Sequence, residues 1–530
     1  MSNGSRSRPP HVQVAIVGFG PAGSVAAALL GARGISTYVV DRLVDVYDKP
    51  RAIALDHEIF RLFDNMGIAD AVRPHVAPFT ASQHFGADGQ LIRRIDMVPE
   101  PYPLGYVPSM VFTQPPVEEA LRAHASGLPA VTVELGTEVV RVEQDADGAT
   151  LLIRDAEGRD GSIRADWVIA CDGASSGVRQ QLGIRLDDLV FDEPWLVVDV
   201  RVTDAAALAR LPQTSAQFCD PARPTTFVIG PGNHRRWEIM LLPDEDRFAM
   251  EKPERVWSLL SKWLSPDEAI LWRASSYRFH ALVAERWRDG RVFLAGDSAH
   301  QQPPFIGQGM CQGLRDVSNL VWKLASVIEG KADPSLLDSY GEERAAHVRE
   351  LTGRIKTIGH VICERDPVAA RERDARILAE GGGAPRTITR QEIVPPLRTG
   401  VVAGDTPAAG TLFPQPWIRA AEGDRLLDAV AGTGWRLVLD ASFAADPAID
   451  AAAKAAGLTI VRISGGDAGG PNAAGPGLAE RDGVLARWFA GHGVGAAVVR
   501  PDHYVFGTAA TAADLLALIT TLGRRLARAA

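Results

Sequence analysis

The stretch from Val12 to Asp41 restricts the fold more than any other part of the chain. An apolar run rich in β-branched residues leads into a turn with Gly18, Gly20 and Gly23, and an alanine-rich segment then precedes a second apolar run. This order predicts a buried strand, a tight turn, a helix and a second strand that ends at Asp41. A Gly-x-Gly-x-x-Gly pattern in that setting is typical of dinucleotide binding, which the sequence therefore favours.

Each glycine of this turn has its own expected role. Gly18 permits the tight turn, Gly20 lets the backbone approach a pyrophosphate, and Gly23 lets the helix close on the strand. Free N–H groups at the start of the helix attract phosphate, and Asp41 stands where a carboxylate accepts hydrogen bonds from ribose. The alternative is an ordinary tight turn between strand and helix. The two flanking strands and the acid make that alternative the weaker interpretation.

Composition and charge narrow the class of protein. The length of 530 residues predicts roughly two to four domains. The net charge of −9 argues against a nucleic-acid surface, and no apolar stretch approaches the roughly 20 residues that span a bilayer. The polar segment 1–10 is expected to be a disordered leader without a signal core. Four widely spaced cysteines fit a reducing cytoplasm and offer no metal site.

Two further strand ends belong with the glycine turn. One buried strand runs into Asp172 and Gly173, and another, near residues 291–295, runs into Gly296 and Asp297. Their apolar character matches that of the first strand, so they are predicted to join the same parallel sheet. Residues 11–194 and 288–365 are therefore predicted to form one discontinuous, Rossmann-like α/β domain.

The other segments differ in their pattern of apolar and polar residues. Residues 195–287 contain short alternating strands and turns, which predict an inserted, largely antiparallel sheet. Residues 366–410 are polar and rich in glycine and proline, so a linker or surface arm is expected there. Residues 411–530 alternate strands and helices again and predict a small separate α/β domain.

The ordered set of three motifs, at 18–23, 172–173 and 296–297, resembles the class A FAD-dependent aromatic hydroxylases, the family of para-hydroxybenzoate hydroxylase and phenol hydroxylase. Finer similarity, in Pro50-Arg51-Ala52-Ile53 and in the segments 219–224, 294–300 and 307–324, is to the 3-(3-hydroxyphenyl)propionate hydroxylases. The resemblance covers residues 10–365 well. The C-terminal segment resembles the thioredoxin-like domain of phenol hydroxylases but lacks a Cys-x-x-Cys, which implies a structural or dimer-forming role.

The resemblance implies a set of FAD-binding positions. The helix after the 307–309 turn would face the pyrimidine edge of the flavin, and its dipole would stabilise the anionic reduced form. The family usually has Glu at Asp41 and often Asn at Cys311, so these two contacts differ here. The implied positions are Gly18, Gly20, Pro21, Ala22, Gly23, Asp41, Arg42, Arg51, Gln114, Asp172, Gly173, Gly296, Asp297, Pro304, Gly307, Gln308, Gly309 and Met310.

The resemblance also implies the chemistry. NADH or NADPH would reduce FAD, O₂ would add to give a flavin hydroperoxide, and its distal oxygen would attack an electron-rich ring. This chemistry needs no metal or covalent nucleophile, and no catalytic residue is assigned. The inserted sheet would cover the flavin, although an ordinary core or surface role is the alternative for each candidate on it. The candidates for substrate contact are Phe218, Arg223, Phe227, Arg235, Trp237 and Met240.

Three functions stay open from sequence. The first is hydroxylation of a phenolic compound, such as an acid resembling 3-hydroxyphenylpropionate. The second is hydroxylation of a polycyclic aromatic natural product, since such enzymes share the three motifs and a similar tail. The third is a non-catalytic FAD-binding module. A flavin halogenase is less favoured because the Trp-x-Trp-x-Ile-Pro signature is missing from the sequence. The sequence does not separate NADH from NADPH, and a homodimer is an expectation from the C-terminal domain.

Overall fold

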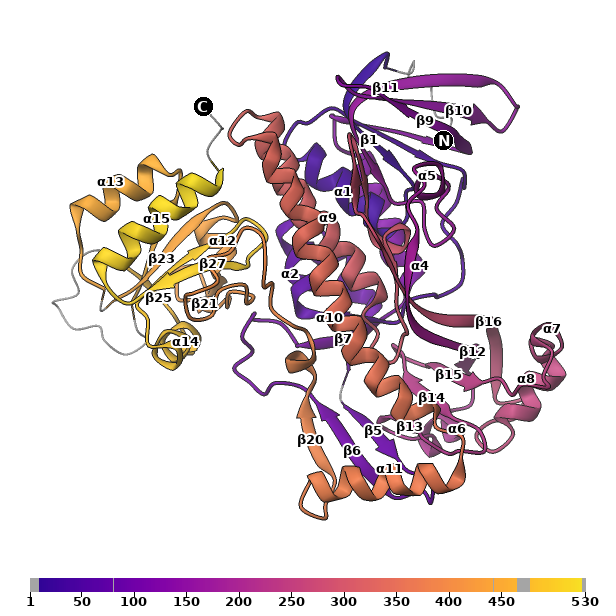
Figure 1. Cartoon of the computed structure of the whole chain (residues 1–530). Helices are drawn as coiled ribbons and strands as arrows, with labels where there is room; N and C mark the ends of the chain where they lie inside the picture. The colour runs from indigo at the N-terminus through magenta and orange to yellow at the C-terminus, as the bar shows by residue number, and fades with distance from the viewer. Residues whose placement is uncertain (1–8, 80, 442, 465–476, 527–530) are drawn as a thin grey trace.

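The computed structural model describes residues 9–79, 81–441, 443–464 and 477–526. Residues 1–8 of the predicted leader therefore lie outside the described residues. Three sheets organise the molecule: a mainly parallel sheet, a large second sheet below it, and a smaller sheet that forms the core of the C-terminal domain (Figure 1). None of the described helices has the length and apolar content needed to cross a membrane.

The first sheet has eight strands: six in the order β17-β18-β11-β1-β2-β8, together with β10, which pairs with β11, and β9, which pairs with β10. β1, β2, β8, β11 and β18 run parallel, which confirms the predicted Rossmann-like α/β fold. The strands are β1 (His11–Val17), β2 (Thr37–Asp41), β8 (Val131–Leu135), β9 (Thr137–Gln144), β10 (Ala149–Asp155), β11 (Asp160–Ala170), β17 (Arg288–Asp289) and β18 (Val292–Leu294).

Helices pack on this sheet because their apolar faces complete its core. α1 lies between α4 and α9, and the long helices α9 and α10 run down from the first sheet towards the second (Figure 1). A small three-stranded sheet, β3-β7-β4, follows the first βαβ unit. These elements are α1 (Pro21–Gly31), α2 (His57–Asn65), α3 (Ala69–Val72), α4 (Gln114–Ser126), α5 (Gly177–Gln181), α9 (Gly309–Ile328), α10 (Asp338–Cys363), β3 (Ala54–Asp56), β4 (Val76–Pro78) and β7 (Ser109–Phe112).

The second sheet has nine strands in the order β19-β16-β12-β15-β14-β13-β5-β6-β20. Its central pairs are antiparallel, as predicted, but it draws strands from outside residues 195–287. The elements are β5 (Ser82–Phe85), β6 (Leu91–Asp96), β12 (Leu186–Val202), β13 (Ser215–Phe218), β14 (Thr225–Ile229), β15 (His234–Met240), β16 (Ala269–Ala284), β19 (His300–Gln301), β20 (Arg386–Thr389), α6 (Ala205–Arg210), α7 (Arg247–Met250), α8 (Pro253–Leu260) and α11 (Pro367–Glu380).

The segment 366–410 contains regular structure where a linker or arm was expected. Helix α11 begins after Asp366, whose carboxylate accepts hydrogen bonds from two backbone N–H groups, and β20 then pairs in parallel with β6. The buried face of α11 carries the charged pair Arg373 and Asp374 beside Ala370 and Ile377. Because charged residues stand on the inner face, the apolar period that would predict this helix is weak.

The C-terminal domain has the thioredoxin-like arrangement expected from the resemblance. Its sheet has the order β25-β24-β23-β26-β27, with β23 and β24 parallel and β26 and β27 antiparallel to their neighbours. The elements are β21 (Trp417–Ile418), β22 (Arg425–Leu426), α12 (Leu427–Ala431), β23 (Arg436–Asp440), α13 (Pro447–Ala455), β24 (Thr459–Ser464), β25 (Leu478–Ala479), α14 (Val484–His492), β26 (Ala496–Val499), β27 (Val505–Ala509) and α15 (Ala512–Leu526).

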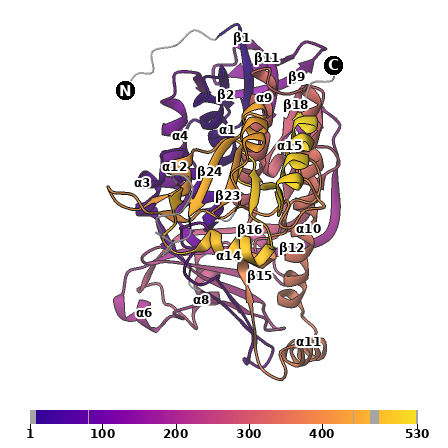
Figure 2. The same ribbon diagram turned by 90° about the vertical axis from the view of Figure 1, so that its left-hand side faces the viewer.

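Buried charges join this domain to the first one, beside which it lies in Figure 1 and in front of which it lies in Figure 2. Asp428 accepts hydrogen bonds from Arg61 at 2.7 and 2.9 Å and from Arg436 at 2.6 Å, and all three side chains are buried. In a second cluster, Glu343 pairs with Arg500 at 2.8 Å and with Lys323 at 2.9 Å. Each cluster combines residues from both domains, so the charges fix how the domains dock.

Candidate functional site

The glycine turn leaves a space at the start of α1. A Cβ on Gly18 would lie 2.4 Å from the Cys171 carbonyl oxygen, and one on Gly23 would lie 2.0 Å from the Gly18 carbonyl oxygen. A Cβ on Gly20 would have no described atom within 4 Å. No described side chain caps α1, and its first turn holds no acidic residue. Unpaired backbone N–H groups therefore border an open space that suits a diphosphate.

Asp41 fastens this turn to the end of β2. Its Oδ2 accepts a hydrogen bond from the Phe19 N–H at 2.6 Å, and its Oδ1 accepts one from the Leu43 N–H at 2.8 Å. The carboxylate is thus held beside the glycine turn, with lone pairs left for a ribose hydroxyl. Arg42, next along the chain, is exposed. Their contacts to a cofactor remain predictions.

Gln114 fixes the backbone around Arg51. Its Oε1 accepts hydrogen bonds from the N–H groups of Arg51 at 3.1 Å and Ala52 at 2.6 Å, and its Nε2 donates to Glu118 at 3.1 Å. The Arg51 side chain itself is about half exposed. Asp297 is exposed, and the positive charge of Arg51 acts to lower its pKa. Arg51 and Asp297 therefore act electrostatically on the same region of the site.

Asp172 and Gly296 are held by internal hydrogen bonds. Asp172 accepts from the Ser176 hydroxyl at 2.5 Å and from the Val178 N–H at 3.1 Å, and burial raises its pKa. The Gly296 N–H donates to Asp316 at 2.9 Å. Asp316 was not predicted from sequence, since one acid in an amphipathic helix gives no signal. Gly173, with a φ of 81°, has no described atom within 4 Å of its Cβ position, so it borders open space.

The turn before α9 also leaves a helix start without a cap. Gln308 is the N-cap residue, but no described side chain caps this helix either. The Gln308 side chain points elsewhere: it donates to Asp56 at 3.1 Å and accepts from Arg315 at 2.8 Å. Gly307 packs on β3, since its Cβ would lie 2.6 Å from that of Ala54. The helix start thus presents backbone N–H groups and a partial positive charge.

The residues around the 307–310 turn were predicted only in part. Pro304 accepts the Gly307 N–H at 2.7 Å, which closes the turn, and Gly309 and Met310 form the first turn of α9. A buried ion cluster lies behind them, in which Arg315 contacts Asp56 at 2.5 Å and Glu58 at 2.6 Å. The sequence interpretation missed this cluster, because charges on predicted helices are usually solvated. A cavity of about 400 Å³ borders it.

Most of the predicted substrate residues do not reach this region. Phe227 and Trp237 are fully buried in a core cluster against α8, and Phe218 packs partly buried on the same cluster. Arg235 donates to backbone carbonyls of the turn before β15, and Arg223 pairs with Glu245 at 2.7 Å. Met240 alone of the six belongs to the opposite cluster.

The opposite face of β15 contacts the loop that carries Arg51. Arg236 donates to the carbonyls of Pro50 at 3.0 Å and Arg51 at 2.8 Å, and it forms a fork with Asp199 at 2.7 and 3.1 Å. Alternate residues of a strand face opposite sides, so residues 234, 236, 238 and 240 share this face. The sequence interpretation chose Arg235 and Trp237 from the other face of β15, because alternation alone does not show which face of a strand the first domain covers.

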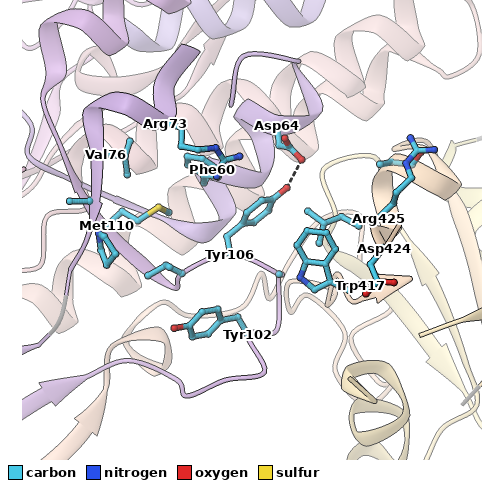
Figure 3. A pocket seen from close by; sticks show the side chains of 16 residues that line it. Phe60, Asp64, Arg73, Val76, Tyr102, Tyr106, Met110, Trp417, Asp424 and Arg425 are labelled. Atoms are coloured by element: carbon cyan, nitrogen blue, oxygen red, sulfur yellow. Dashed lines mark hydrogen bonds between the residues drawn. The ribbon is translucent and has the colours of Figure 1, made fainter. Parts of the chain in front are cut away.

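A second cavity, of about 530 Å³, lies between the first domain and the C-terminal domain. Figure 3 shows the Tyr106 hydroxyl directed at Asp64, with which it forms a hydrogen bond of 2.6 Å, and Arg73 beside Phe60. Trp417, which belongs to the C-terminal domain, lies on the opposite side of the cavity. The residues that line this cavity include none of the predicted FAD positions. It is therefore separate from the glycine turns.

Taken together, the parallel sheet, the open glycine turns at two helix starts and the covering second sheet define a dinucleotide-binding protein. The FAD binding domain family matches residues 11–354, and the HcaD C-terminal domain family matches residues 410–525.

Relatives match nearly the whole chain. A probable NADH-specific resorcinol 4-hydroxylase of Rhodococcus jostii is 37% identical over 96% of this chain and 94% of its own. A 3-(3-hydroxy-phenyl)propionate/3-hydroxycinnamic acid hydroxylase of Burkholderia cenocepacia is 36% identical over 93% of each. Among solved structures, the flavin-dependent monooxygenase PieE has a TM-score of 0.80 at 23% identity, covering 98% of this chain and 99% of that chain.

The chain belongs to the family of FAD-dependent aromatic hydroxylases. It is therefore an FAD-dependent monooxygenase, and the predicted family, fold class and FAD cofactor are confirmed.

Proposed function

We propose that this enzyme hydroxylates a small phenolic compound with NADH or NADPH and O₂. The observation that carries the proposal is the tie between the second sheet and the Arg51 loop, made by the two carbonyl contacts of Arg236. This tie sets the inner face of the sheet against the predicted flavin region. The names of the two relatives, which act on resorcinol and hydroxyphenylpropionate, support a phenolic substrate.

Within this proposal, the chain's own residues bind and orient the reactants. The backbone around Gly20 would hold the diphosphate of FAD, and Asp41 would hold the ribose. Asp297 would hold the ribityl or pyrophosphate region, and the start of α9 would face the pyrimidine edge of the ring system. When bound, FAD supplies electron transfer from the nicotinamide and activation of O₂. The positive end of α9 would stabilise negative charge on the ring system. Burial of the sheet face excludes water from the reaction.

A single aromatic ring is favoured over a polycyclic substrate. The space between the second sheet and α10 is filled by aromatic side chains, of which one pair is stacked and the others meet edge-on. The ring of Trp195 lies 5.6 Å from that of Phe279 and 5.7 Å from that of Phe305, which in turn lies 5.8 Å from that of Phe191. These rings belong to one buried cluster, so they leave less room for a large substrate.

Three further expectations belong to the same proposal. The C-terminal domain is proposed to support a homodimer, and the enzyme to work in the cytoplasm. The net charge of −9 supports a small-molecule partner and no nucleic acid. Size-exclusion chromatography with light scattering tests the dimer, since a monomer mass would contradict it.

The direct test uses purified enzyme reconstituted with FAD. Oxidation of NADH and of NADPH is followed with resorcinol, 3-(3-hydroxyphenyl)propionate and a bicyclic phenol, while hydroxylated product and hydrogen peroxide are measured. We expect one monocyclic phenol to accelerate oxidation and to be hydroxylated with little peroxide. Hydroxylation of the bicyclic phenol alone would contradict the small-substrate proposal. Oxidation that no phenol stimulates would contradict the proposed reaction.

A further inference from the structure

A row of buried polar residues crosses the inner face of the second sheet. Strand register places Glu238 on β15 beside Thr226 on β14, Thr226 beside Gln217 on β13, and Gln217 beside His84 on β5. Residues in register on neighbouring strands share a face. The four residues are 1–5% exposed. Sheets rarely bury such a row without partners, so its surroundings decide what it does.

Glu238 lies between two groups that border the proposed flavin region. Two residues before it on the same face, Arg236 donates to the carbonyl of Arg51. Two residues after it, Met240 packs in the cluster that contains Phe305, the residue after Pro304. Glu238 therefore lies on the same sheet face as these two residues, between the one that contacts the Arg51 loop and the one that packs beside Phe305.

The row is incompletely hydrogen-bonded among the described residues. Thr226 donates to Gln217 at 2.5 Å, but no described residue donates a hydrogen bond to the Glu238 carboxylate. Its closest ion-pair partner is Arg236, with Nη1 4.0 Å away, and 7% of the Glu238 side chain remains exposed. The Nδ1 atom of His84 is buried and also lacks a described partner. The Glu238 carboxylate thus remains as an acceptor for a polar ligand.

The arginines near Glu238 form hydrogen bonds with other groups. Arg236 uses its guanidinium on Asp199 and on backbone carbonyls, and Arg273 on β16 contacts the Pro50 carbonyl and the Tyr277 hydroxyl. Glu238 is therefore left without a dedicated cation.

Burial raises the pKa of Glu238 to about 7, with Arg236 and Arg273 opposing the rise and Asp199 adding to it. Burial lowers the pKa of His84 to about 3, so this imidazole is neutral near pH 7. A carboxyl group that titrates near neutral pH suits general base catalysis.

We propose that Glu238 is a catalytic residue that accepts the hydrogen bond and then the proton of the substrate's ring hydroxyl. This inference rests on the proposed hydroxylation of a phenol. The O–H bond of the phenol breaks, its proton passes to a Glu238 carboxylate oxygen, and the electron pair stays on the phenolate oxygen. The phenolate donates electron density into the ring, which makes the ring carbon more nucleophilic. Thr226 and Gln217 are hydrogen-bonded to each other, so they take no part in this step.

The test compares holoenzymes of the wild type, Glu238→Gln and Glu238→Asp, with Thr226→Val as a matched control from the same row. Hydroxylated product is measured across the pH range around neutrality, and phenol binding is followed by the change in flavin absorbance. We expect wild-type kcat to rise with pH through about 7. We expect Glu238→Gln to lose this rise and about 10²–10⁴-fold of kcat, while phenol affinity falls less than about tenfold.

The controls separate a proton acceptor from a structural residue. Glu238→Asp keeps a carboxylate, so we expect it to retain the pH dependence at a reduced kcat, and Thr226→Val should retain both the pH dependence and most of kcat. A Glu238→Gln enzyme with the wild-type pH profile and kcat would overturn the inference while leaving the hydroxylase function intact. Loss of the pH dependence in Thr226→Val as well would also overturn it. A wild-type enzyme that holds FAD but hydroxylates no phenol would overturn the proposed function itself.

Discussion

Replacing Gly20 with alanine tests the cofactor site without disturbing the fold. Gly20 has a φ of −68° and a ψ of −172°, which any residue adopts, and its Cβ would meet no described atom within 4 Å. Alanine in place of glycine at this N-cap position costs about 1 kcal/mol or less. The added methyl group would instead stand in the space where the diphosphate has to approach the start of α1.

The expected effect is on FAD affinity. A methyl group there would separate the diphosphate from the backbone N–H groups, and two charge-assisted hydrogen bonds of ~1.5 kcal/mol each give a loss of about 3 kcal/mol. This corresponds to roughly 100-fold weaker binding. FAD binding to apoprotein is measured by quenching of flavin fluorescence, and thermal unfolding of the apoprotein reports on the fold.

Gly404→Ala is the matched control. Gly404 is exposed, and its Cβ would also meet no described atom within 4 Å, but it lies far along the chain from the glycine turns. We expect wild-type FAD affinity in this variant and wild-type unfolding in both. Gly20→Ala that binds FAD as tightly as the wild type would refute the placement of the diphosphate. Gly20→Ala apoprotein that no longer folds would refute the claim of open space.

Three further predictions concern buried charges. Asp428→Asn leaves two buried guanidinium groups without a carboxylate and should lower the free energy of unfolding in urea by about 3–5 kcal/mol. Asp450→Asn, in an exposed ion pair, should lower it by less than about 1 kcal/mol. Equal losses in the two variants would contradict the stabilising role of Asp428. Burial favours a higher pKa for Glu343, but the neighbouring Arg500 and Lys323 outweigh it and lower the pKa to about 2. The ionised Glu343 therefore stabilises the fold fully above pH 4.5, its ordinary pKa, and this stabilisation is lost as pH falls to about 2. Over this range the free energy of unfolding of the wild type should drop by about 3 kcal/mol more than that of Glu343→Gln. Parallel plots of unfolding free energy against pH for the two proteins would disprove it. Arg236→Lys cannot hold both carbonyls of the Arg51 loop, so we expect a severalfold smaller share of NADH oxidation to yield hydroxylated product, and an unchanged ratio of product to peroxide would count against that role.

The parallel core of the first domain follows from local sequence signals. β1, β2, β11 and β18 are apolar runs that end in glycine or acidic residues, and such runs form buried parallel strands whatever lies around them. The glycine turns follow as well, because Gly18 and Gly23 touch backbone atoms that only a residue without Cβ can approach. These signals are contained in short stretches of chain, so the sequence is enough to place them.

The inner face of the second sheet depends on information that a strand does not carry. In β15, Trp237 and Glu238 are neighbours in sequence, and the apolar residue lies on the face against α8 while the acid faces the first domain. Sequence reasoning expects aromatic side chains around an aromatic substrate and selects Trp237. The assignment of faces depends on which domain covers each side of the sheet, and contacts distant in sequence, such as Arg236 with the Arg51 carbonyl, decide that.

The same distant contacts give the C-terminal domain a role without a thiol pair. The Tyr504 hydroxyl donates to Glu58 at 3.0 Å, and Arg315 links Glu58 to Asp56 and to Gln308, the N-cap residue of α9. A continuous chain of hydrogen bonds therefore runs from this domain to the turn proposed to face the flavin. Buried charges need partners in fixed positions, so the docked domain holds the start of α9 in one arrangement. Such positioning needs packing and charge complementarity but no redox-active cysteine pair, which agrees with the lack of a Cys-x-x-Cys motif in the sequence.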